Sequence, residues 1–183
     1  MLKFSWTIAA TVVISFAFGQ GKFYTKTGSI SFYSKTKMED IEAHHRSVTC
    51  VLDTKNGTVQ FAVLMKGFEF RKALMQEHFN ENYVESDKYP KAQFKGQVTN
   101  SSSIDYTKEG TYPAKIKGTL TIHGEEKEVE TDGMITVKDE KIGTAAEFQI
   151  AIADYKISVP ALVKDNISKN ISIKVSCSLE PLR

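Results

Sequence analysis

The chain has 183 residues, of which 41% are hydrophobic, and its formal net charge is only +2. A charge this close to zero argues against a nucleic-acid partner, which would need a concentrated basic face. The chain has two cysteines, too few for a small scaffold held together by disulfides. What remains is an ordinary globular domain, long enough to bury a full core.

The first segment of the chain has the pattern of an export signal. An apolar run covers 8–18, and the small residues Ala17 and Gly19 suit a signal peptidase that cleaves before Gln20. The alternative is a retained membrane helix, but the run is shorter than the roughly 20 residues that span a bilayer. We therefore expect 1–19 to be a signal peptide and 20–183 to be one domain, periplasmic or secreted.

Most of the remaining chain alternates between apolar and polar residues, a pattern typical of antiparallel strands with one face in water. The alternating runs are 29–35, 46–54, 56–64, 114–124, 127–137, 142–152 and 171–179, with a further strand opening at Phe94. A turn signal at 53–57 joins two of them into a hairpin. About eight such strands close naturally into a barrel that holds either packed side chains or one ligand. We predict an all-β, eight-stranded antiparallel barrel.

Two segments have helical composition. The stronger is 71–79, which is rich in good helix formers, and the weaker is 160–169. The stronger one leads into a polar stretch with Tyr83 and Pro90 before the strand at Phe94. Pro90 cannot donate to a strand ladder, so it ends this extended stretch.

The chain carries no recognisable catalytic motif. It has no glycine-rich phosphate loop, no nucleophile elbow and no zinc-type spacing. His44 and His45 alternate across a strand, and Met75 and His78 lack a third ligand, so we expect no metal and no cofactor. An acid–base pair built on Glu77 and His78 is the enzymatic alternative.

The two cysteines, Cys50 and Cys177, have the same inward parity on their strands. An exported protein can form disulfides. Unpaired cysteine is nevertheless among the most buried residue types. We predict two buried free thiols.

The segment 67–96 resembles the YceI-like family of exported bacterial proteins. The resemblance rests on His78-Phe79, on Tyr83-Val84, on the run 87–90 (Asp-Lys-Tyr-Pro) followed by Phe94, and on 120–124 (Leu-Thr-Ile-His-Gly). It extends over about 29–179. Two positions depart from the family pattern: Met75-Gln76 stands where an Arg-Asp step is common, and Val84 stands where a second aromatic is common.

The resemblance implies a lipocalin-like barrel in the periplasm that binds long amphiphiles, with polyisoprenoids the best-known class. In such a barrel a short amphipathic lid would close the open end. We expect Phe68, Phe70, Leu74, Met75 and Phe79 to face inward, and Glu69, Lys72, Gln76 and Asn80 to face water. The alternative is a plug of core side chains with no ligand.

The predicted ligand-binding residues of the lumen and lid are Phe32, Phe61, Phe68, Phe70, Leu74, Met75, His78, Phe79, Tyr83, Phe94, Gly118 and Phe148. Gly118 is included because small inward residues would leave room for a prenyl chain. We predict non-catalytic binding of a polyisoprenoid lipid or quinone, with transient membrane contact as a possible route. The alternatives are a lipid-modifying enzyme and a stress-related interaction protein with a filled barrel.

Overall fold

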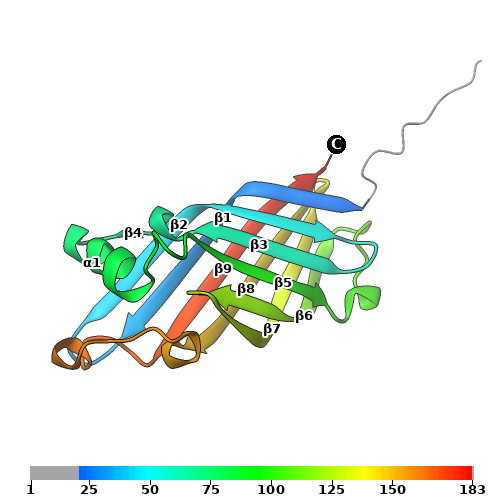
Figure 1. The fold of residues 1–183 in the computed structure, drawn as a ribbon. Helices are drawn as coiled ribbons and strands as arrows, with labels where there is room; N and C mark the ends of the chain where they lie inside the picture. Colours follow the sequence, from blue (N-terminus) through cyan, green and yellow to red (C-terminus); the bar gives the residue numbers. More distant parts are fainter. Residues whose placement is uncertain (1–20, 183) are drawn as a thin grey trace, which may run out of the picture.

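The computed structural model describes residues 21–182, which form one antiparallel sheet closed into a barrel (Figure 1). The sheet order is β1-β9-β8-β7-β6-β5-β3-β2, and pairing of β1 with β2 closes the wall. A ninth strand, β4, has only two residues and extends the sheet beside β2. The predicted eight-stranded all-β barrel is therefore confirmed.

The strands are long and mostly connected by short turns. Their bounds are β1 (Lys22–Lys35), β2 (Asp40–Asp53), β3 (Thr58–Leu64), β4 (Glu69–Phe70), β5 (Lys91–Val98), β6 (Gly110–Ile122), β7 (Glu125–Lys138), β8 (Lys141–Ala151) and β9 (Asn170–Pro181). Every alternating run of the sequence overlaps one of these strands. The part of β1 before Gly28 was not predicted, because the register shifts there break the alternation.

Helical structure is scarce and short. It comprises η1 (Met65–Gly67), α1 (Ala73–His78), the π-helical turn η2 (Phe79–Tyr83), η3 (Ser101–Ser103), η4 (Ile152–Tyr155) and η5 (Ala161–Val163). The predicted helix at 71–79 is thus shorter than expected, and 160–169 contains only a single 3-10 turn. Asn166 and Ser168 in that segment can bond the local backbone and so compete with a helix. Within residues 21–182, no helix is both long and apolar enough to cross a membrane.

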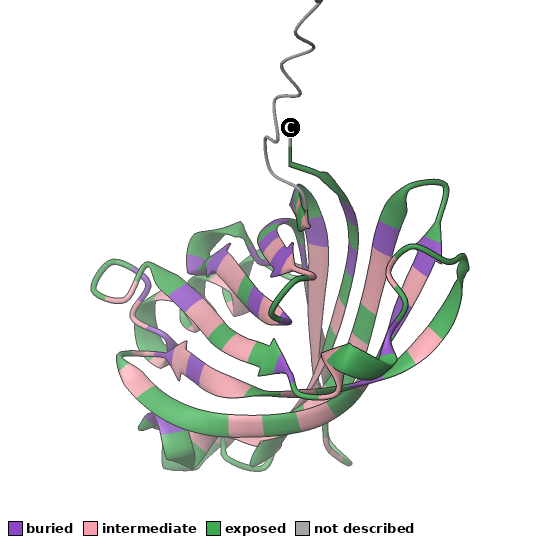
Figure 2. Ribbon diagram, turned by 90° about the vertical axis from the view of Figure 1, so that its right-hand side faces the viewer, coloured by how far each residue is buried: buried purple, intermediate pink, exposed green. Residues whose placement is uncertain are grey.

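Burial alternates along the strands, which gives the wall its banded appearance in Figure 2. The interior divides into two apolar clusters. One includes Leu52, Ile142 and Leu179 and fills one end of the barrel. The other includes Phe68 and Tyr155 and lies toward the lid, which we define as 68–83. The first cluster therefore packs the end of the barrel away from the lid.

The two cysteines lie in the first of these clusters, and both are free and buried. A hydrogen bond with the Cys177 thiol, together with burial, raises the pKa of Cys50, which keeps it protonated at neutral pH. This agrees with the prediction of free thiols. Thiol counting under denaturing, non-reducing conditions should find two. The predicted signal peptide and its cleavage site lie outside the described residues.

Candidate functional site

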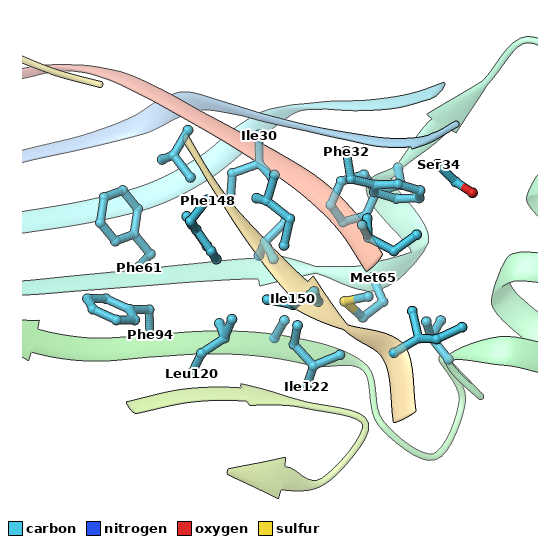
Figure 3. Close-up of a pocket in the computed structure, with 18 of the residues that line it drawn as sticks. Ile30, Phe32, Ser34, Phe61, Met65, Phe94, Leu120, Ile122, Phe148 and Ile150 are labelled. Atoms are coloured by element: carbon cyan, nitrogen blue, oxygen red, sulfur yellow. The ribbon is translucent and has the colours of Figure 1, made fainter. Parts of the chain in front are cut away.

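A cavity of about 460 Å³ occupies the part of the barrel beneath the lid. Inward positions of all eight wall strands contribute to its lining. Figure 3 shows Phe61, Phe94, Leu120 and Phe148 projecting into it from different strands. The period-two alternation places these side chains there, because each strand turns every second residue toward the lumen.

The floor of the cavity is formed by the cluster at the filled end. Leu52, Val59 and Ile135 belong to that cluster and also line the cavity. The lumen therefore contains both a cavity and a packed core.

Four phenylalanines pack where the lid meets the wall. The Phe79 ring lies 5.1 Å from Phe70, 5.4 Å from Phe32 and 5.7 Å from Phe68, measured between ring centroids. Separations of this size are typical of favourable aromatic pairs. The cluster joins β1 to both sides of α1 and fixes the lid against the barrel.

Three lid side chains are oriented differently from the prediction. Leu74 touches the rim of the cavity, but its side chain is 59% exposed rather than turned inward. Gln76 and Asn80, expected to face water, are half-buried. Gln76 accepts a bond from the Phe70 backbone N–H at 3.3 Å, and the Asn80 amide donates to the Gln76 carbonyl at 2.8 Å. These polar groups are needed inside the lid because the segment is too short to satisfy its own backbone.

Polar groups gather at the mouth, the opening between α1, the 36–39 turn and the 156–169 loop. The Lys72 ammonium bonds the Glu39 carboxylate at 2.9 Å, which ties the start of α1 to the turn. His78 and Asn166 also border the cavity here. The lumen is thus apolar in depth and polar at its entrance.

The segment just after the lid is anchored by His123 in the β6–β7 turn. Its Nδ1 lies 3.0 Å from the Tyr155 carbonyl oxygen, and its Nε2 lies 2.7 Å from Glu85 Oε2. The Tyr89 ring packs edge-on against the imidazole at 4.5 Å. The Leu-Thr-Ile-His-Gly turn therefore connects the segment after the lid to η4.

Eleven of the twelve predicted residues line the cavity: Phe32, Phe61, Phe68, Phe70, Leu74, Met75, His78, Phe79, Tyr83, Phe94 and Phe148. Their role in binding stays a prediction. Gly118 is the exception. A Cβ built there would lie 2.4 Å from the Lys95 carbonyl oxygen and 2.7 Å from the Phe94 ring. The Phe94 ring occupies the space that Gly118 was expected to leave for a ligand.

Further lining residues were not singled out from the sequence. Leu120, Ile122, Val129 and Ile150 could have been found, since they lie on the predicted inward faces. The residues from the 156–169 loop, such as Ile167, carry no such signal because the loop has no regular period.

The enzymatic alternative places an acid–base pair at Glu77 and His78. His78 borders the cavity, but the neighbouring Glu77 does not. The described histidine–carboxylate pairs, His44 with Glu42 and His123 with Glu85, have no member in the cavity lining. Within residues 21–182, no three His, Cys, Asp or Glu side chains are grouped so that they could hold a metal ion.

The closed antiparallel barrel with an apolar lumen is a lipocalin-like fold. More specifically, residues 6–179 match the YceI-like domain model, and the chain belongs to that family. Among curated proteins none matches the chain significantly.

Solved structures share the fold at low sequence identity. A polyisoprenoid-binding domain from Saccharophagus degradans is 14% identical with a TM-score of 0.77, covering 88% of this chain and 99% of its own. Burkholderia cenocepacia BcnA is 14% identical with a TM-score of 0.68, covering 83% and 95%. The Campylobacter jejuni YceI protein is 15% identical with a TM-score of 0.57 and covers 100% of both chains.

Proposed function

We propose that the protein binds one polyisoprenoid lipid or quinone non-covalently in the barrel, as a carrier or store, and does not turn it over. The observation that carries this proposal is the 460 Å³ cavity, whose depth is lined by aliphatic and aromatic side chains. A pocket of this size and character is typical of small-molecule sites. Membership of the YceI-like family and the polyisoprenoid-binding neighbour support the same ligand class.

Burial of apolar surface would drive binding. Each buried methylene contributes about 0.8 kcal/mol, so one five-carbon prenyl unit contributes about 4 kcal/mol before the cost of ordering the chain. The wall offers aromatic faces and branched aliphatic groups, as at Phe61, Phe148 and Ile150 (Figure 3). Such surfaces pack well against the methyl branches of a prenyl chain.

The distribution of polar groups predicts how the ligand is oriented in the cavity. Lys72, Glu39, His78 and Asn166 lie at the mouth, whereas the floor is formed by residues such as Leu52 and Val59. A buried polar head would lack hydrogen-bond partners at the floor and lose free energy there. The headgroup therefore lies at the mouth and the chain extends inward.

The mouth would also be the membrane-facing end, in a periplasmic protein exported by the signal at 1–19. Met38, Leu74 and Leu162 are 72%, 59% and 99% exposed, and they belong to three segments around the mouth. Exposed apolar side chains with basic neighbours such as Lys164 suit an anionic lipid surface. Contact at the mouth would let the lipid move between the membrane and the lumen without crossing water.

Mass spectrometry of lipid extracted from protein purified gently from its native host tests the ligand class. We expect a prenyl lipid at close to one molecule per protein. Recovery of only straight-chain fatty acids would contradict the prenyl assignment. A bound lipid that is chemically altered on incubation with the purified protein would instead favour the enzymatic alternative.

A further inference from the structure

The wall of the barrel is incompletely paired between two of its strands. β7 and β8 pair only from Gly133↔Ala146 to Lys138↔Lys141. The preceding part of β7, 125–132, and the following part of β8, 147–151, are not paired with each other. Their other edges are held firmly, because β6 pairs with β7 along its whole length and β9 pairs with β8 through Ala151.

The unpaired edges form a window with definite borders. Toward the floor, the Thr131 hydroxyl reaches the Glu147 carbonyl oxygen at 3.3 Å, just beyond the last ladder pair. Toward the mouth, η4 packs against β7, and its buried Tyr155 is held through the carbonyl contact with His123. Val129 on one edge and Phe148 on the other both line the cavity, so the lumen reaches the window from inside.

The cavity also extends to the outer face of the wall. Its lining includes Met134 and Ala145, which pair with each other directly below the window. Both belong to the outer face, since their neighbours Ile135 and Ala146 turn inward, and Met134 is 43% exposed. An apolar surface outside the barrel is therefore continuous with the lumen.

The capacity of the lumen shows what this surface could hold. The lumen ends at the filled floor, so its depth sets the longest chain that fits within it. A longer chain with its headgroup at the mouth cannot fit whole. Its remaining units need a second exit, and the floor is filled.

We propose that the window between β7 and β8 is the exit for long prenyl chains, whose distal units lie over Met134 and Ala145. This inference rests on the proposed prenyl-binding function. It predicts that the outer surface matters for long chains and not for chains that the lumen holds entirely.

The test is a charge placed outside the window. Met134→Lys, and separately Ala145→Lys, put an ammonium on the outer face of the wall, on the exposed path of the chain. Leu64→Lys is the matched control, since Leu64 is 55% exposed and lies outside the cavity lining. Each variant is titrated with two fluorescent prenyl alcohols, a short one that the lumen holds entirely and a long one that exceeds its depth, and its melting temperature is recorded.

Both window variants should bind the long probe about tenfold more weakly or worse, the loss expected when roughly two methylenes fail to be buried. Binding of the short probe, and of both probes by Leu64→Lys, should stay at the parent level. Equal affinities of the folded window variants and the parent for the long probe would overturn the window. A parent that binds neither probe would overturn the proposed function itself.

Discussion

Gly118 shows how a single residue can mislead a sequence-based prediction. It pairs directly with Gly96 across β5 and β6, and the Phe94 ring covers both glycines. A side chain at either position would meet backbone and ring atoms, so the glycines are needed for packing of the wall. The sequence revealed the inward parity of Gly118 but not the ring that covers it.

We expect Gly118→Ala to lower the free energy of unfolding by about 1–3 kcal/mol, the usual cost of overpacking. Gly143→Ala is the matched control, because the nearest atoms to its added Cβ are at 3.6 Å, an ordinary contact. That change should be neutral or stabilising by up to about 1 kcal/mol. Urea denaturation of both variants measures the difference, and equal stabilities would refute the packing account.

His45 is a second residue whose role appears only in the structure. It is buried, its Nδ1 accepts the Ser47 backbone N–H at 3.0 Å, and burial lowers the pKa of the imidazole below 6.5. In the unfolded chain the His45 imidazole takes up a proton near pH 6.5, whereas in the folded protein it stays neutral until the pH is lower. The stabilisation is therefore complete above that pH and is lost as the pH falls through the lower, folded pKa.

Acidification from about pH 7.5 to about pH 5.5, a range that brackets the ordinary histidine pKa, should therefore lower the melting temperature. The fall should be shallower in His45→Asn, which keeps an acceptor for the Ser47 N–H but cannot be protonated. Calorimetry at both pH values gives the two slopes. Parallel slopes would show that His45 does not contribute to the acid sensitivity.

At the scale of elements, α1 has only six residues, and none of them is fully buried. A helix this short is unstable alone, so tertiary contacts must hold it. Those contacts are the four phenylalanines at one end of the lid and the His123 contacts beyond the other. The sequence predicted a helix and apolar positions, but its helix was too long because composition alone does not show where the π-helical turn begins.

Phe79→Ala should release the lid from the barrel. We expect the free energy of unfolding to fall by about 3 kcal/mol, the lower value for such truncations, since Phe79 is only half-buried. A bound prenyl probe should also dissociate faster, because affinity changes within one site appear mainly in the off-rate. Stopped-flow competition measures that rate.

Leu74→Ala is the control for the lid, since this side chain is 59% exposed. Its stability should stay within about 0.5 kcal/mol of the parent. An off-rate for Phe79→Ala no faster than the parent's would mean that the lid does not control ligand release.

At the scale of the whole molecule, the barrel has one filled end and one open end. Strand number and closure could be predicted because the alternation of each strand is visible in the sequence and eight strands close readily. The split between β7 and β8 could not, since it depends on register between strands and not on the pattern within one. The mouth residues of the 156–169 loop could not be predicted either, because the loop has no regular period.

The two ends of the barrel differ, and this difference predicts which end contacts a membrane. The 156–169 loop, which carries the exposed Leu162, lies at the same end as α1 and the β1–β2 turn (Figure 1). Leu162→Asp should reduce co-sedimentation with anionic vesicles, while Leu182→Asp, at the opposite end, should not. Equal loss in both variants, or none in either, would remove the mouth as the docking end.

The central claim is that a prenyl chain occupies the lumen beneath the lid, and a titration of two tryptophan variants tests it most directly. Ile150 and Gln149 are neighbours on β8, but only Ile150 lines the cavity. We predict that Ile150→Trp narrows the cavity, keeps its fold and weakens binding of the short prenyl probe, while Gln149→Trp binds it like the parent. Unchanged binding by a folded Ile150→Trp variant would contradict a ligand in the lumen.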